Sequence, residues 1–155
     1  MLLSLRHLVL IGAFVLGASA ASAQDVEKIK LKRQAHGKPI ALPVDIHWPK
    51  TAAARVPAFI IIHGSGGVRA QRELAYARRF NELGVAAVVM DSFTPRGVER
   101  TVNDQRSVTD AEMVADTIAL LRAVAHNPRI DATRIGAIGF SKGAALSSKR
   151  RCADT

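Results

Sequence analysis

Residues 135–146 read IGAIGFSKGAAL, and this stretch decides the fold. The apolar run before Gly139 predicts a buried strand, and the small residues after Gly143 predict the first turn of a helix. Between them, residues 139–143 match the pattern G-x-S-x-G, which places Ser141 on a sharp turn from strand to helix. Glycines two before and two after the serine fit that turn, because those two residues pack against each other and leave no room for a Cβ.

This turn predicts nucleophilic chemistry at Ser141. A helix that begins directly behind a serine points its N-terminal N–H groups at the place where negative charge develops during attack on a carbonyl. Ser141 is therefore the candidate catalytic nucleophile, and the backbone N–H of Lys142 is one candidate oxyanion donor. For the side chain of Lys142 we expect an ordinary, solvated position along the new helix.

The chain before this turn begins with two alternating segments and continues with buried strands. Residues 26–33 and 40–48 alternate between apolar and polar side chains, and residues 36–39 carry turn chemistry, so a β-hairpin is predicted. Continuous apolar runs are typical of strands that are buried on both faces of a parallel sheet. Three such runs occur, at 58–63, 85–90 and 135–138.

Two helices are predicted between these strands. Residues 72–83 repeat apolar side chains on one face, and Gly84 is a typical C-cap. The face comprises Leu74, Ala77, Phe80 and Leu83. A capping box at 109–112 opens the second helix, which ends at Asn127. The fold class is therefore α/β, with a mostly parallel sheet, flanking helices, an N-terminal hairpin and a βαβαβ unit that leads into the Ser141 turn.

A glycine-rich loop follows the first parallel strand. Residues 63–67 read HGSGG, and glycines allow backbone N–H groups to point into a site. Ligands in open α/β sheets bind at the carboxyl ends of the strands, where this loop and the Ser141 turn both lie. The backbone N–H of Ser65 is therefore the second candidate oxyanion donor.

The segments 60–67, 88–97 and 134–143 together resemble the α/β-hydrolase superfamily, and within it the dienelactone hydrolase-like family. The resemblance runs from Val26 to Leu146 and covers the N-terminal part of that fold. It implies hydrolysis of small-molecule carboxylic esters or lactones without a cofactor or metal. It also implies that His63 orients the oxyanion loop and is not the base. Dienelactone hydrolases proper use a cysteine nucleophile, so a serine here favours an esterase-type relative.

The remaining members of a catalytic triad are expected after the nucleophile, in the order acid and then histidine. Only 14 residues follow Ser141 (155 − 141), and they contain no histidine and a single acid, Asp154. We therefore expect a truncated chain: a partial hydrolase domain at 24–146 and an irregular tail at 147–155, with a natural short variant as the alternative. Weak or absent activity is expected, and a non-catalytic remnant or binding module is the rival function.

Several other polar residues have a structural and a functional interpretation. Asp91 follows a strand but precedes Ser141, so it is expected to cap its own loop. Arg96 is expected to be exposed, with a substrate carboxylate as its alternative partner. His36 and His47 are expected to be solvated on the hairpin, and His126 to lie at a helix C-terminus. Substrate-binding residues are not predicted.

Residues 1–23 are predicted to be a secretory signal peptide. A short polar segment at Arg6 and His7 precedes an apolar stretch at 8–16, and the small residues 21–23 form a cleavage site. The expected location is exported, either periplasmic or secreted, with no stable membrane span after cleavage. A retained signal anchor is the alternative. Cys152 is the only cysteine, so an intramolecular disulfide is excluded.

Composition limits the partners that the protein is expected to have. The formal net charge is +9 and 48% of the residues are hydrophobic, which is enough for one folded domain. The basic residues are scattered and only 5% of the residues are aromatic, so a nucleic-acid partner is not expected. A basic surface-binding protein stays open as a weaker alternative, and the oligomeric state is not predicted.

Overall fold

The computed structural model describes residues 25–51 and 53–144. The elements, in chain order, are β1 (Asp25–Ala35), β2 (Lys38–Trp48), β3 (Val56–Ile62), α1 (Glu73–Glu82), β4 (Ala86–Met90), the 3₁₀ turn η1 (Thr94–Arg96), α2 (Asp110–Ala125) and β5 (Ile130–Gly139). The strands form one sheet in the order β1-β2-β4-β3-β5. β3 pairs in parallel with β4 and β5, whereas β2 pairs antiparallel with β1 and β4. The predicted α/β fold class is therefore confirmed.

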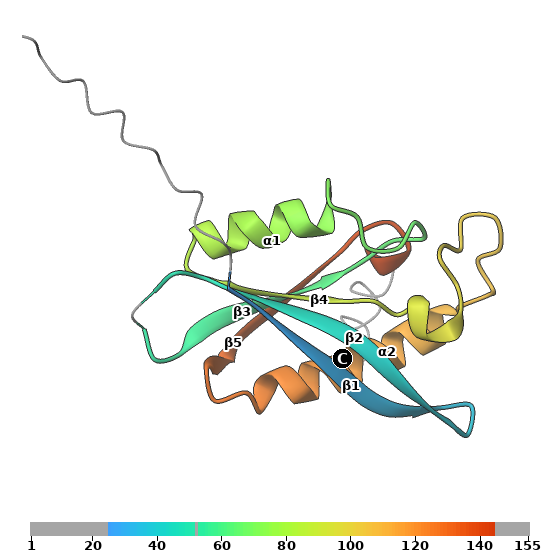
Figure 1. Ribbon diagram of the computed structural model, residues 1–155, viewed down its shortest axis with the longest axis horizontal. Coiled ribbons are helices and arrows are strands. Elements are labelled where there is room, and N and C mark those ends of the chain that lie inside the picture. The colour runs from blue at the N-terminus through green and yellow to red at the C-terminus, as the bar shows by residue number, and fades with distance from the viewer. Residues whose placement is uncertain (1–24, 52, 145–155) are drawn as a thin grey trace, which may run out of the picture.

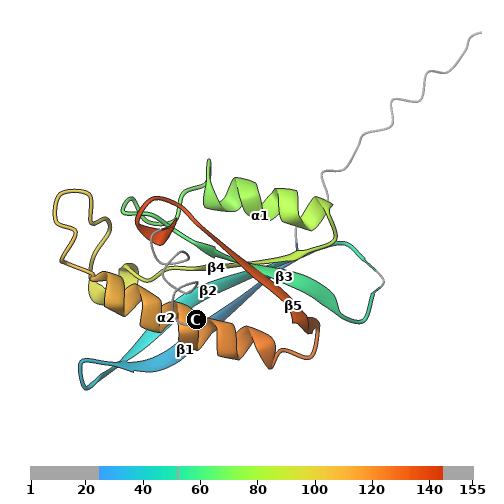
Figure 2. The same cartoon turned by 180° about the vertical axis from the view of Figure 1, so that it is seen from behind.

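The sheet lies between two helices, with α1 on one face and α2 on the other (Figures 1 and 2). The larger apolar cluster lies on the α2 face, where Ile60 and Val88 pack with Met113 and Leu120. A smaller cluster lies on the α1 face, where Ile61 and Val89 pack with Ala77 and half-buried neighbours. Because neighbouring residues of β3 and β4 point to opposite clusters, both strands are apolar throughout.

The hairpin is present as predicted. All eleven residues of β1 pair with β2, from Asp25 opposite Trp48 to Ala35 opposite Lys38. His36 and Gly37 form the connection, and both have positive φ, at 49° and 73°. Two residues with positive φ match the twist of the flanking strands, which explains why two residues are sufficient for this turn.

Two element ends differ from the prediction. β5 begins at Ile130, opposite Val56, and a register shift between Val56 and Ala58 carries it past its polar start. α1 ends at Glu82, one residue earlier than predicted; Gly84, whose φ is +75°, follows the C-cap, and Val85 N–H donates to Phe80 O at 2.9 Å. The prediction that Leu83 lies on the buried face of this helix is wrong. It is 76% exposed, because it is the C-cap residue, where the helix has already ended.

α2 begins with the predicted capping box. The Thr109 hydroxyl accepts from Glu112 N–H, and the Glu112 carboxylate accepts from Thr109 N–H at 2.8 Å. The helix buries Met113, Leu120 and Val124, as its apolar repeat predicts. The same buried face also contains a carboxylate, Asp116, which the apolar pattern does not predict.

Two predicted segments lie outside the described residues: the signal peptide at 1–23 and the irregular tail at 147–155. The described part of the predicted hydrolase domain is 25–51 and 53–144. In that part, no helix is both long enough and apolar enough to cross a lipid bilayer.

Candidate active site

Ser141 lies on the predicted sharp turn. β5 ends at Gly139, and a helical turn begins at Lys142. Ser141 has φ +52° and its side chain is exposed. A left-handed backbone costs a residue with a Cβ about 1–2 kcal/mol, so the surrounding contacts must hold it there. Ser141 is thus held in a strained conformation that presents its hydroxyl to solvent.

The flanking glycines are required by close backbone contacts. A Cβ on Gly139 would overlap the carbonyl of Gly143 and would lie 2.7 Å from Ala144 N. A Cβ on Gly143 would lie 2.6 Å from Ile62 O and 2.7 Å from His63 O. The predicted packing between positions 139 and 143 is therefore present, and Gly143 also lets the end of β3 approach the turn.

The HGSGG loop lies directly against the Ser141 turn. A Cβ built on Gly64 would lie 2.8 Å from Phe140 O and 3.2 Å from the Cβ of Ser141. Gly67 has φ +75° and donates its N–H to Gly64 O at 3.0 Å, which closes the loop. Two segments 74 residues apart in sequence (141 − 67) are therefore in contact at the carboxyl ends of β3 and β5.

The two candidate oxyanion donors are free to bind a ligand. Within 25–51 and 53–144, no acceptor is bonded to the backbone N–H of Ser65 or of Lys142. Both N–H groups belong to the two segments that meet at Ser141.

Both ring nitrogens of His63 are hydrogen-bonded to backbone groups beside the site. Ser92 N–H donates to its Nε2 at 3.2 Å, so Nε2 carries no proton and the proton lies on Nδ1. Nδ1 is 2.9 Å from Gly64 O and therefore donates to it. The ring is buried and packs edge-on against Phe93, with 4.4 Å between the ring centroids. His63 thus orients the glycine loop, as the family resemblance implies, and has no free nitrogen with which to act as base.

The other described histidines also lie away from Ser141. His36, at the hairpin tip, is solvated as predicted and contacts Glu112 at 3.1 Å. His126 caps the end of α2 as predicted, with Nδ1 2.7 Å from Arg122 O. The prediction for His47 is wrong, because this ring is 6% exposed. His47 pairs opposite Ala87 and so lies on the sheet face that α1 covers, with neither ring nitrogen hydrogen-bonded within the described residues.

The buried His47 ring is expected to make stability depend on pH. Burial lowers its pKa from 6.5; Asp45 raises it in part, while Lys28 and Arg78 lower it further. As the pH falls, the His47 ring is therefore protonated in the unfolded chain before it is protonated in the folded chain. The free energy of unfolding that the neutral ring contributes is present above pH 6.5 and is lost as the pH falls below it. Between pH 7 and 5, the thermal midpoint of His47→Leu is expected to fall less steeply than that of the wild type. Equal slopes for the wild type and His47→Leu would contradict this expectation.

Lys142 differs most from its prediction. Its side chain is 5% exposed, and Nζ donates to Gln105 O and Val108 O, both at 2.6 Å. The Asp110 carboxylate lies 3.8 Å away. The expected solvated position is wrong because the 98–108 loop folds over the start of the new helix and supplies carbonyl acceptors. Nothing in the local sequence pattern indicates that loop as the partner.

The Arg96 side chain is only 9% exposed, so the prediction that it is exposed is wrong. Its guanidinium binds both oxygens of Asp116, at 2.9 and 3.1 Å, and donates to Ser92 O at 2.6 Å. Arg33 from β1 binds the same carboxylate.

Glu112 lies beside this cluster, within 3.3 Å of the Arg96 guanidinium. Burial alone would raise the pKa of Glu112, but the Thr109 N–H and hydroxyl, His36 and Arg96 together lower it to about 2. These charges join the hairpin, η1 and α2, so Arg96 is not available to a substrate carboxylate.

Asp116→Asn is expected to lower the free energy of unfolding by about 2–3 kcal/mol, because hydrogen bonds to charged groups are worth about that much when one partner is buried. Asp116 is fully buried between Arg33 and Arg96, so the variant leaves two guanidinium groups without a counter-charge. Urea unfolding measures the effect. Asp131→Asn, which disrupts the more exposed pair with Arg134, is the control and is expected to change the midpoint much less. Similar midpoint shifts for the two variants would contradict a special role of the buried carboxylate.

Asp91 has the loop-capping role that was predicted. Its Oδ1 accepts from Phe93 N–H at 2.8 Å and from Thr94 N–H at 3.1 Å, and its other oxygen accepts from the Thr94 hydroxyl. These bonds hold the start of η1, which brings Ser92 and Phe93 against His63.

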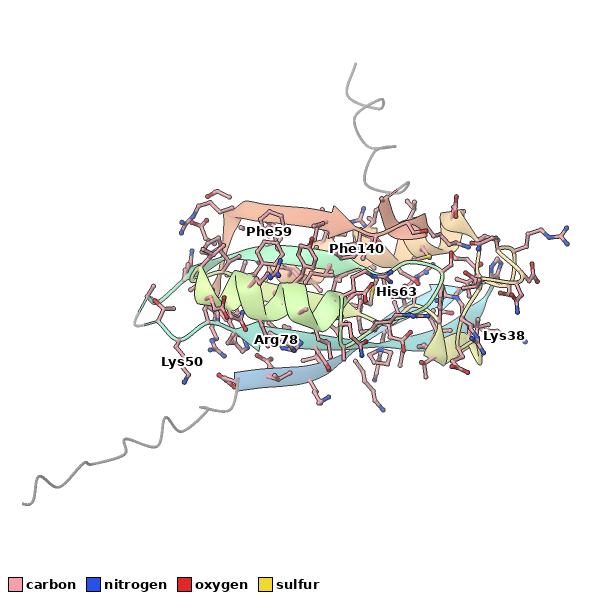
Figure 3. All side chains as sticks on the ribbon, turned by 90° about the horizontal axis from the view of Figure 1, so that it is seen from above. Lys38, Lys50, Phe59, His63, Arg78 and Phe140 are labelled. Carbon is pink, nitrogen blue, oxygen red and sulfur yellow. The ribbon has the colours of Figure 1, made fainter. Side chains whose placement is uncertain are left out.

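A second wall of the site comes from α1 and was missed by the sequence analysis. The carboxylate of Glu73 is fully buried and accepts from Arg69 N–H and from Arg72 Nε, at 2.9 and 2.8 Å. The Arg72 guanidinium lies over the ring of Phe140, 5.2 Å from its centre. Phe140 also packs edge-on against Tyr76, along the flank of α1 (Figure 3). Phe140, the residue before Ser141, therefore packs against the start of α1.

No group of three or more His, Cys, Asp or Glu side chains suited to a metal ion occurs among residues 25–51 and 53–144.

Comparison with known proteins agrees with this arrangement. A family model, BD-FAE, matches residues 44–150, which include the HGSGG loop and the Ser141 turn. The chain belongs to the BD-FAE family. The resemblance to α/β-hydrolases of the dienelactone hydrolase-like group is confirmed by this match and by the fold. No curated protein sequence matches the chain.

Solved structures with the same fold include esterases and a dienelactone hydrolase. Est1E from Butyrivibrio proteoclasticus is 21% identical and superposes with a TM-score of 0.59, over 79% of this chain and 46% of its own. A dienelactone hydrolase from Anabaena variabilis is 18% identical, with a TM-score of 0.57 over 79% and 55%. The esterase Est2 from Thermogutta terrifontis is 20% identical, with a TM-score of 0.59 over 81% and 42%. This BD-FAE family member thus spans about half the length of the structures that it resembles.

Proposed function

We propose that this chain carries the nucleophile and oxyanion half of a serine hydrolase site for carboxylic esters or lactones. Ser141 is the nucleophile, and the backbone N–H groups of Lys142 and Ser65 receive the oxyanion. The observation that carries the proposal is the left-handed backbone of the exposed Ser141, held in contact with Gly64 of the HGSGG loop. A strained serine between two free backbone donors is what acyl transfer requires.

The reaction has two parts, and the described residues serve the first one best. In the first part, the Ser141 oxygen bonds to the carbonyl carbon as its proton passes to solvent, and the π electron pair moves to the carbonyl oxygen, where the two N–H groups stabilise it. The intermediate collapses when the bond from the carbonyl carbon to the alcohol oxygen breaks; that oxygen takes a proton from solvent and leaves as the alcohol, and an acyl-serine remains. In the second part, water adds to the acyl-serine, and the carboxylic acid is released as Ser141 regains its proton. Losing one oxyanion donor typically costs about 3–4 kcal/mol of transition-state stabilisation.

The proton of Ser141 has no acceptor among the described residues, since no side chain of 25–51 or 53–144 bonds to its hydroxyl. A serine without a positioned base is a poor nucleophile at neutral pH. We therefore propose slow acylation and weak turnover for the chain as given. An oxyanion hole and substrate binding alone support about 10³–10⁴-fold acceleration over water.

The substrate is proposed to be a small ester or lactone, and the chemistry requires no cofactor. Support comes from the names of the similar structures: one is an esterase, one is a dienelactone hydrolase, and Est1E has been solved with ferulic acid bound. The serine at position 141, where dienelactone hydrolases proper have cysteine, favours the esterase alternative. Export to the periplasm or beyond the cell is proposed on the signal-like residues 1–23.

Intact-mass spectrometry after incubation with p-nitrophenyl acetate tests this function. The expected result is a single acetyl adduct, formed slowly and faster at higher pH, where more of the serine proton is lost to solvent. An unmodified chain at every pH would overturn the proposal and favour a non-catalytic remnant or binding module. Salt-insensitive elution from heparin would in addition remove the basic surface-binding alternative.

A further inference from the structure

The 98–108 loop, which connects η1 to α2, contacts both oxyanion segments. Thr101 donates its N–H to Ser65 O at 2.8 Å, and the Ser65 hydroxyl donates to Gln105 Oε1 at 2.9 Å. The same loop provides the two carbonyl oxygens, of Gln105 and Val108, that accept from Lys142 Nζ. Gln105 thus binds Ser65 through its side chain and Lys142 through its backbone.

Most of this loop has little else to hold it. Residues 102–107 are exposed, whereas Thr101 and Val108, which flank them, are buried. The bonds from Lys142 Nζ are short and charge-assisted, which makes them stronger than neutral hydrogen bonds. A buried ammonium must also keep its acceptors, because leaving it without them is costly. The two hydrogen bonds from the Lys142 side chain are therefore the main connection between the loop and the Ser141 turn.

We propose that the side chain of Lys142 is a positioning group that sets both oxyanion donors at once. It fixes its own backbone N–H at the start of the helical turn, and through Gln105 and Thr101 it fixes Ser65 on the opposite side. The inference rests on the proposed function, because it assigns Ser65 and Lys142 the same oxyanion. The side chain itself touches no reacting atom.

The first experiment measures whether Lys142 holds the loop, independently of any activity. Amide hydrogen exchange is followed in the full-length wild type and in Lys142→Met, which keeps the length and removes the ammonium. The Thr101 amide, bonded to Ser65 O, is expected to exchange at least about tenfold faster in the variant, whereas amides of β3 such as Ile61 stay unchanged. An unchanged Thr101 amide would overturn the inference, whatever the reactivity of Ser141.

The second experiment measures the effect on Ser141. An uncharged fluorophosphonate labels the serine, and its maximal rate is separated from its binding constant. Lys142→Met is expected to lower the maximal rate about 10–100-fold with unchanged binding, because misplaced donors act on the transition state. Lys50→Met, at the end of the molecule away from the carboxyl ends of the parallel strands (Figure 3), is the control and is expected to match the wild type.

The outcomes separate the inference from the function on which it rests. A labelled wild type with an equal rate for Lys142→Met overturns the positioning role only. A wild type that is never labelled overturns the proposed function, and the exchange of Thr101 then decides whether Lys142 holds the loop. If Lys142→Met does not fold, Gln105→Ala replaces it: this exposed residue loses its bond to Ser65 and keeps its backbone carbonyl, so a smaller fall in the maximal rate is expected, and no fall would overturn the inference.

Discussion

Ser141→Gly is expected to abolish acylation by p-nitrophenyl acetate and, at the same time, to stabilise the fold by up to about 1 kcal/mol. The hydroxyl that accepts the acyl group is absent, so no adduct can form. The left-handed backbone at φ +52° is strained for serine but free for glycine, and this relief exceeds the entropy that glycine adds to the unfolded chain. A variant that loses reactivity and gains stability indicates that the strained backbone at position 141 serves the reaction and not the stability of the fold.

Ser141→Ala separates the two effects. Alanine also lacks the hydroxyl, but its Cβ keeps the backbone strain, so this variant is expected to lose acylation without gaining stability. Thr133→Ala, which removes an exposed hydroxyl near the other end of β5, is the matched control and is expected to keep the adduct. Equal stability of the glycine and alanine variants would contradict the strain, and an adduct on either would contradict the role of Ser141.

Gly139→Ala is expected to destabilise the chain by more than about 3 kcal/mol, or to prevent folding. The new Cβ would overlap the backbone carbonyl of Gly143 and would crowd Ala144 N, and backbone atoms of the turn cannot move without opening it. The denaturation midpoint in urea measures the loss.

Gly136→Ala, three residues earlier on β5, is the matched control. Its Cβ would meet the ring of Phe59, at 2.6 Å from the nearest ring carbon. That ring is half-buried and stacks on Phe80 along α1 (Figure 3), so it can turn away at a smaller cost. A midpoint for Gly139→Ala equal to that of Gly136→Ala would show that the contact between positions 139 and 143 is not what defines the turn.

The fold was predictable because its signals are local. The alternation of the hairpin, the apolar runs of β3 and β4, the capping box at Thr109 and the C-cap at Gly84 each depend on a few neighbouring residues. The Ser141 turn belongs to the same class, since only glycine fits at 139 and 143. Leu83 shows the limit, because an apolar repeat does not say where the covered part of a helix ends.

The buried polar contacts were not predictable, because their partners are distant in sequence. Lys142 is buried by carbonyls of the 98–108 loop, and Arg96 by a carboxylate 20 residues later on α2. The position of Asp116 could have predicted one of these contacts. It lies between Met113 and Leu120 on the buried face of α2, where a carboxylate requires a cationic partner. His47 offered no such signal, since the hairpin alternation gives no indication that α1 covers its outer face.

The most direct test of the central claim, that Ser141 is the reactive residue of this fold, is to map a fluorophosphonate adduct by tryptic peptide mass spectrometry of the full chain. Cleavage after Arg134 and Lys142 isolates residues 135–142, whose only hydroxyl is that of Ser141. The adduct is expected on this peptide and on no other. An adduct on the peptides that contain Ser65 or Ser92, or none at all after prolonged incubation, would contradict it.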